Sequence, residues 1–158
     1  MTTTELARGS DLIPGELFDR LVSRIVRDEK VNHELATRIT DQALAFLGAC
    51  ASARETLAPS AMVDIGWHTF ILYTREYSAF CNRVAGRFIH HDPTDDGRPD
   101  ASPGDVRRRT VAAIRAAGYV VNEDLWLDMS SKCTQCADGC THSGGCKNDC
   151  HMTTTIAE

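Results

Sequence analysis

The sequence predicts an all-α protein: an irregular bundle of four main helices, a short fifth helical turn and an irregular cysteine-rich tail. Apolar residues recur every three or four positions through most of the chain, which is typical of helices that bury one face. Caps, prolines and glycines stand where these periodic stretches begin and end. The periodicity disappears beyond Met129. We therefore expect an N-terminal arm (residues 1–13), a helical domain (14–129) and a tail (130–158).

The first two helices follow from periodicity and capping. Pro14 is suited to a first helical turn, and leucines and isoleucines continue at helical spacing to about residue 29. Asn32 is a candidate cap for a second helix that reaches about residue 51. Cys50 lies on the apolar face of that helix, so we expect it to fill the core as an inert thiol.

Two more helices and a short turn complete the predicted domain. Ser60 is expected to cap the longest helix, which ends at Gly86. Ser102, followed by a proline, begins a fourth helix that stops at Gly118. Asn122 then begins a short helical turn that contains Leu125 and Trp126.

Length and charge exclude several classes of partner. The chain has 158 residues, enough for one core, with 17 basic and 22 acidic side chains and a net charge of -5. This balance argues against nucleic acids and anionic membranes as partners. No stretch approaches the ~20 apolar residues of a membrane span, and residues 1–10 lack a signal-peptide layout. We expect a cytoplasmic protein.

The tail concentrates soft and borderline metal ligands. Two cysteines separated by two residues can direct both sulfurs at one ion, and three glycines permit tight turns around it. Because apolar residues are scarce here, metal or covalent links would have to order the segment. The candidate ligands, seven within 19 residues, are Cys133, Cys136, Cys140, His142, Cys146, Cys150 and His151.

The tail pattern leaves several interpretations open. Seven ligands exceed the four that one zinc ion takes, and only one CxxC pair is present. The tail is therefore a zinc site with spare ligands, a thiolate cluster for zinc or Cu(I), a set of modified or crosslinked cysteines, or a disordered segment without a role.

A second candidate site lies in the middle of the chain. Asp64 and His68 are four residues apart and share a helix face, while His90 and His91 follow the predicted helix end. These side chains offer a second set of metal ligands. The competing interpretation is structural: Asp64 favours the helix dipole and His68 packs beside a tryptophan.

This region carries a family resemblance. The segment WHTFILYTREYSAFC, residues 67–81, followed by GRFIHHDP, residues 86–93, resembles the glycine-rich domain-containing protein-like family, in its small actinobacterial branch. The resemblance covers roughly residues 17–93. Similar bacterial sequences end in a CxxCxxxC tail, matched here by Cys133, Cys136 and Cys140 and extended by further ligands. The resemblance implies no particular reaction.

Three functional hypotheses follow. The first is a small metal-binding protein that holds zinc or Cu(I) through the tail. The second is a precursor peptide with a folded helical leader, whose cysteine-rich end is changed by a modifying enzyme. The third is an interaction module that binds a protein partner without catalysis, around Trp67, Tyr73 and Tyr77. No nucleophile-elbow, phosphate-loop, dinucleotide or HExxH pattern favours an enzyme.

Overall fold

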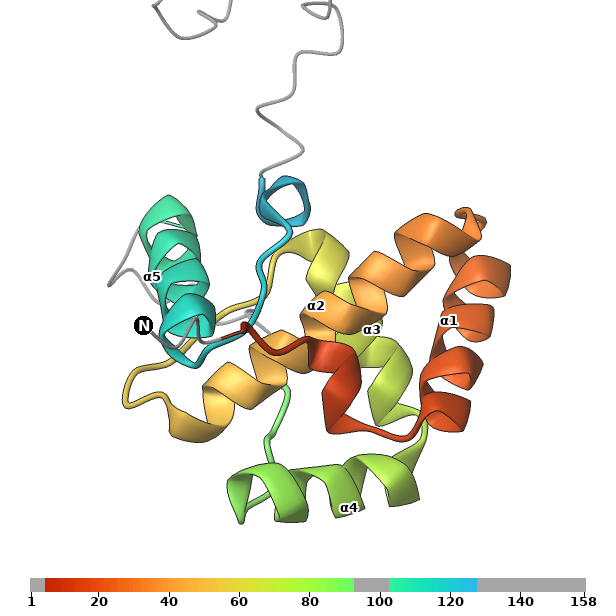
Figure 1. The fold of residues 1–158 in the computed structure, drawn as a ribbon, viewed down its shortest axis with the longest axis horizontal. Coiled ribbons are helices and arrows are strands. Elements are labelled where there is room, and N and C mark those ends of the chain that lie inside the picture. Colours follow the sequence, from red (N-terminus) through yellow and green to blue (C-terminus); the bar gives the residue numbers. More distant parts are fainter. Residues whose placement is uncertain (1–4, 93–102, 128–158) are drawn as a thin grey trace, which may run out of the picture. The chain divides into compact units, whose positions relative to one another are not determined.

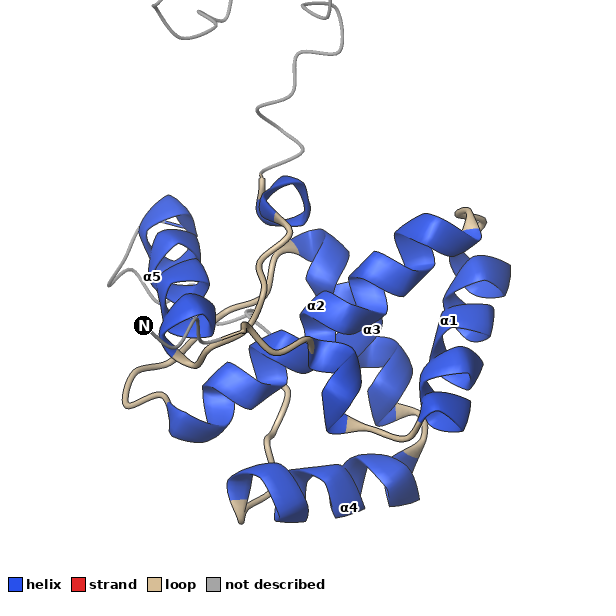
Figure 2. Ribbon diagram, viewed as in Figure 1, coloured by secondary structure: helices blue, strands red, loops and turns tan. Residues whose placement is uncertain are grey.

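The computed structural model describes residues 5–92 and 103–127, and within these ranges the fold is all-α. Figures 1 and 2 show helices joined by loops. The elements are the 3-10 helix η1 (Gly9–Leu12), the α-helices α1 (Gly15–Glu29), α2 (His33–Ser52), α3 (Ala61–Ile71), α4 (Thr74–Ala85) and α5 (Pro103–Ala116), and the 3-10 helix η3 (Glu123–Trp126). The predicted fold class is confirmed.

Helix α2 is the centre of the domain. It packs against η1, α1, α3, α4 and α5, and Figure 1 shows it among these neighbours. Its apolar residues accordingly cover most of its circumference, as in a helix buried on all sides. The fully buried side chains of α2 include Ala36, Ile39, Phe46 and Leu47.

The prediction of one long helix from Ser60 to Gly86 is wrong, because this segment forms two helices, α3 and α4. Tyr73 leaves helical geometry with φ -89° and ψ 66°. The apolar spacing continues across the break, so periodicity alone does not reveal it. The bend sets the Phe70 ring at a steep angle to Tyr77 and Phe80, with ring centroids 5.2 Å apart in both pairs. The four predicted main helices are therefore five.

The predicted caps at Asn32, Ser60 and Gly86 are confirmed. The Asn32 side chain accepts a hydrogen bond from the main-chain N of Leu35 at 2.8 Å, and Ser60 Oγ accepts one from Val63 N at 3.2 Å. Gly86 ends α4 in the left-handed region with φ 65°, where a side chain would be strained. Ser60 thereby fixes the start of the helix that carries Asp64.

Residues 5–13, predicted as part of an arm, instead belong to the packed domain. Ala7 forms a parallel bridge with Tyr119, receiving a hydrogen bond from Val120 N at 3.0 Å and donating one to Gly118 O at 2.9 Å. Gly9 is buried against α2, where an added Cβ would lie 1.9 Å from Asp41 O. The sequence did not predict this packing because the segment is too short to show a periodic pattern of apolar residues.

A buried amide holds residues 119–127 against α2. The Gln42 side chain is fully buried and donates a hydrogen bond from Nε2 to Val120 O at 2.9 Å. Its Oε1 accepts from Asn122 N at 3.0 Å and from the Trp126 indole at 2.9 Å. Ser60 Oγ also donates to Leu125 O at 2.6 Å. The predicted turn at residues 122–126 is confirmed as η3, and these bonds fix its position.

Helices α2 and α3 approach closely at Gly66. A Cβ at this position would lie 2.6 Å from the Ala43 Cβ and 3.0 Å from Ile39 O. Only a residue without a side chain fits there. The contact fixes the rotation of α3 and thereby directs Asp64 and His68 away from α2.

The chain divides into two units, Met1–Leu127 and Asp128–Glu158, and the second lies outside the described residues. Within the described ranges, no helix combines the length and the apolar character that crossing a membrane requires.

Cys50 is expected to react slowly with alkylating reagents in the native protein. Burial raises the pKa of its thiol to about 12, and the Arg87 guanidinium opposes this only in part. A rise from 9.0 to about 12 lowers the thiolate fraction at pH 8 by about 1,000-fold. Because the folded-state pKa is raised, the alkylation rate should keep increasing well above pH 9.

Peptide mass spectrometry after timed iodoacetamide treatment measures this rate, with denatured protein as the control. Equal modification of Cys50 in native and denatured protein would contradict a protected thiol.

Candidate metal centre

The first turns of α3 bring Asp64 and His68 together. They are one helical turn apart, and Nδ1 of His68 lies 3.1 Å from Oδ2 of Asp64. The same nitrogen lies 3.0 Å from the main-chain oxygen of Asp64. Spacing along one helix is sufficient to produce this pair.

The segment after α4 adds a second imidazole. Nε2 of His91 lies 2.7 Å from Oδ1 of Asp64, so the two carboxylate oxygens each face one histidine. One ligand atom from each of Asp64, His68 and His91 lies within 4.8 Å of the other two. We call these three residues the Asp–His–His cluster.

A buried hydroxyl holds the segment that carries His91. Tyr77, on α4, accepts a hydrogen bond from Trp67 Nε1 at 2.9 Å and donates one to Ile89 O at 2.5 Å. Burial raises the pKa of the Tyr77 phenol, which keeps its proton available for donation. The three residues thus connect α3, α4 and the extended residues beyond Gly86.

Aromatic packing supports the cluster from the protein side. The His91 ring lies 4.3 Å from the Trp67 ring and 4.3 Å from the His68 ring, measured between centroids. Trp67 in turn packs on Phe46 of α2 at 5.2 Å. The side chain of His91 is 20% exposed, that of Asp64 30% and that of His68 60%. The cluster therefore packs against the core through Trp67 and is exposed to solvent at His68.

Two imidazoles and one carboxylate form a ligand set suited to divalent transition metals. Imidazole nitrogen and carboxylate oxygen both bind zinc at about 2.0–2.2 Å, and the same set serves iron(II) in many oxygenases. Without metal, each carboxylate oxygen lies within hydrogen-bonding distance of a nitrogen of one ring. A metal ion that binds here would take the place of these contacts.

The structure brings together three of the four residues predicted for the second site. His90 is exposed and does not join the cluster; its ring packs on Phe88 with centroids 4.8 Å apart. Of the rings proposed for protein interaction, Trp67 and Tyr77 are buried and Tyr73 is half-buried. All seven predicted ligands of the tail lie outside the described residues.

Sequence reasoning missed the bond between Tyr77 and Ile89, although a signal for its effect was present. In an extended segment, residues two apart share a side. Ile89 is apolar and buried, so His91 is expected on the inner side and His90 on the outer side. This alternation distinguishes the two adjacent histidines.

Replacing Tyr77 with phenylalanine is expected to lower the free energy of unfolding by about 2 kcal/mol. The change removes the acceptor of the Trp67 indole and the donor to Ile89 O, both in buried surroundings. Chemical denaturation of both proteins measures the loss. Tyr73→Phe is the matched control, since Tyr73 is half-buried and its ring lies beside Arg20. Equal stability of Tyr77→Phe and the parent would contradict this role of the hydroxyl.

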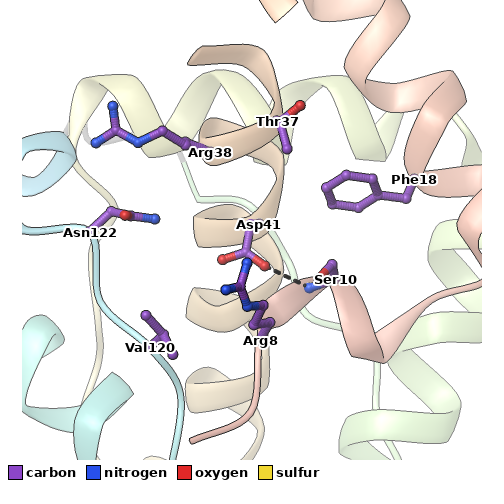
Figure 3. A pocket seen from close by; sticks show the side chains of 8 residues that line it. All are labelled: Arg8, Ser10, Phe18, Thr37, Arg38, Asp41, Val120 and Asn122. Atoms are coloured by element: carbon purple, nitrogen blue, oxygen red, sulfur yellow. Dashed lines mark hydrogen bonds between the residues drawn. The ribbon is translucent and has the colours of Figure 1, made fainter. Parts of the chain in front are cut away.

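A separate cleft of about 240 Å³ lies between η1, α1, α2 and residues 120–122 (Figure 3). It contains side chains of both charges, and Arg38 is paired with Asp124 while Asp41 accepts a hydrogen bond from Ser10 N at 2.9 Å. The lining residues are Arg8, Ser10, Phe18, Thr37, Arg38, Asp41, Val120 and Asn122. None of the predicted ligands is among them.

Comparison with known proteins identifies a family but no activity. No significant match was found among curated proteins or among solved structures. The resemblance to the glycine-rich domain-containing protein-like family stays a prediction. The model of the UCP032817-like family matches residues 12–113, which include α1 to α4 and the whole Asp–His–His cluster. Because this match covers more than half of the chain, the protein belongs to the UCP032817-like family.

Proposed function

We propose that this chain is a small metal-binding protein whose helical domain binds one divalent transition-metal ion, with zinc as the first candidate, through Asp64, His68 and His91. The observation that carries the proposal is the convergence of two imidazoles and one carboxylate from two separate segments within 4.8 Å. An ion pair or a hydrogen bond requires only two residues. A zinc site requires at least three protein ligands around one point, and this cluster provides three.

The surroundings of the cluster support a binding role. Two of its ligands come from one rigid helix, and the third is held by a buried hydrogen-bond network two residues away. Ligands supported in this way lose little conformational entropy when they bind an ion. The Trp67 ring excludes water from one side of His91.

The tail remains part of the proposal as a second set of ligands. Thiolates select zinc and Cu(I), whereas imidazole and carboxylate favour divalent ions, so the two sets would differ in metal preference. A reducing cytoplasm, in which we propose the protein works, would keep these thiols available. Cu(I) is then expected on the tail and not on the Asp–His–His cluster.

The test separates the two sets of ligands. A tail-substituted chain keeps its full length but carries Ser at Cys133, Cys136, Cys140, Cys146 and Cys150 and Asn at His142 and His151. Equilibrium dialysis against zinc, followed by elemental analysis, should find one ion per chain. Adding Asp64→Asn should abolish that binding. The proposal fails if the tail-substituted chain binds no zinc at micromolar concentrations, or binds it equally well with Asp64→Asn.

A further inference from the structure

The Asp–His–His cluster provides three ligands among the described residues. The number of protein ligands distinguishes structural from catalytic zinc sites. Structural zinc sites usually use four protein ligands, whereas catalytic sites use three and leave a position for water or substrate. No fourth His, Cys, Asp or Glu side chain among the described residues joins the group. The cluster therefore has the ligand count of an open centre.

The exposure of the three side chains indicates where an open position would face. His91 is covered on one side by the Trp67 ring, which is 6% exposed and packs on the core. His68 is 60% exposed, so the solvent reaches the cluster from its side. A ligand from solution would approach there without displacing a core residue.

The fold itself supplies no reason for a structural metal. The core has more than twenty buried apolar side chains, and the segment carrying His91 is held by the Tyr77 hydroxyl. Small domains that need zinc to fold lack such a core. The apolar core and the Tyr77 bond thus hold the domain and the His91 segment without help from a metal ion.

Charge indicates the class of that ligand. Two neutral imidazoles and one carboxylate leave a bound divalent ion with a net charge of about +1. Such a centre attracts small anions with oxygen donors. Resting on the proposed function, we propose that the metal at Asp64, His68 and His91 keeps an exchangeable position that binds a small oxygen-donor anion from solution, for which acetate is the probe.

The experiment uses cobalt(II), whose visible absorption changes with its ligands. The tail-substituted chain is loaded with one cobalt ion, dialysed, and titrated with sodium acetate, with sodium perchlorate at equal ionic strength as the weakly coordinating control. We expect acetate to shift the visible bands in a saturable way, with one acetate per metal, and perchlorate to leave them unchanged. Elemental analysis should find the cobalt still bound.

The outcomes separate this inference from the proposed function. If cobalt binds and acetate changes nothing, or if acetate strips the metal instead of joining it, the inference is overturned while the metal site stands. If no cobalt binds to the tail-substituted chain, or if as much cobalt binds after Asp64→Asn is added, the proposed function fails and the inference fails with it.

Discussion

His91→Asn is expected to weaken zinc binding to the tail-substituted chain by more than about 100-fold. Removing a residue that only supports a ligand typically costs 10–100-fold in affinity, and loss of the ligand itself should cost more. His91 contributes one of three donors and faces Asp64 at 2.7 Å. Asparagine keeps a polar side chain but is too short to place an atom where Nε2 of His91 lies.

The neighbouring residue provides a matched control. His90→Asn makes the same substitution at the adjacent residue. The ring of His90 is exposed and packs on Phe88. Competition with a coloured zinc chelator measures both affinities. We expect the His90 variant to bind like the parent within about twofold, given its distance from the cluster. Equal losses in both variants would indicate nonspecific binding by exposed histidines and would contradict the assignment.

Gln42→Leu is expected to lower the free energy of unfolding by about 3–5 kcal/mol. Leucine matches the size of glutamine but makes none of its hydrogen bonds to Val120 O, Asn122 N and the Trp126 indole. A polar group left unpaired in a buried place costs about 1–3 kcal/mol. Because Gln42 is fully buried, water cannot replace it without rearrangement.

A graded variant keeps this prediction testable when Gln42→Leu fails to fold. Trp126→Phe removes the bond from the indole and some apolar surface, while Gln42 keeps its bonds to Val120 O and Asn122 N. Its loss should be smaller than that of Gln42→Leu, and urea denaturation monitored by circular dichroism measures both. A Gln42→Leu protein as stable as the parent would show that these bonds do not hold residues 119–127.

The helices themselves were largely predictable, because each depends on local features. Asn32 and Ser60 cap their helices as their positions indicate, and Gly86 ends α4 where a left-handed residue is required. The break at Tyr73 was not predictable in the same way. No glycine or proline marks it, and it is stabilised by ring packing between residues of α3 and α4.

The candidate site was predictable in part for a similar reason. Asp64 and His68 share a helix face by spacing alone, so their pairing follows from the sequence. The choice between His90 and His91 depends on the Tyr77 bond to Ile89, which joins residues twelve apart. The bond itself leaves no local signal, so only the alternation from the apolar Ile89 could have separated the two histidines. The tail lies outside the described residues, so its predicted ligands stay a prediction.

Anomalous X-ray scattering from zinc-containing crystals, measured on both sides of the zinc absorption edge, tests the metal centre most directly. The proposed centre predicts an anomalous peak about 2.0–2.2 Å from a carboxylate oxygen of Asp64 and from one imidazole nitrogen each of His68 and His91. Zinc peaks found only elsewhere, with Asp64 still hydrogen-bonded to His91, would contradict it.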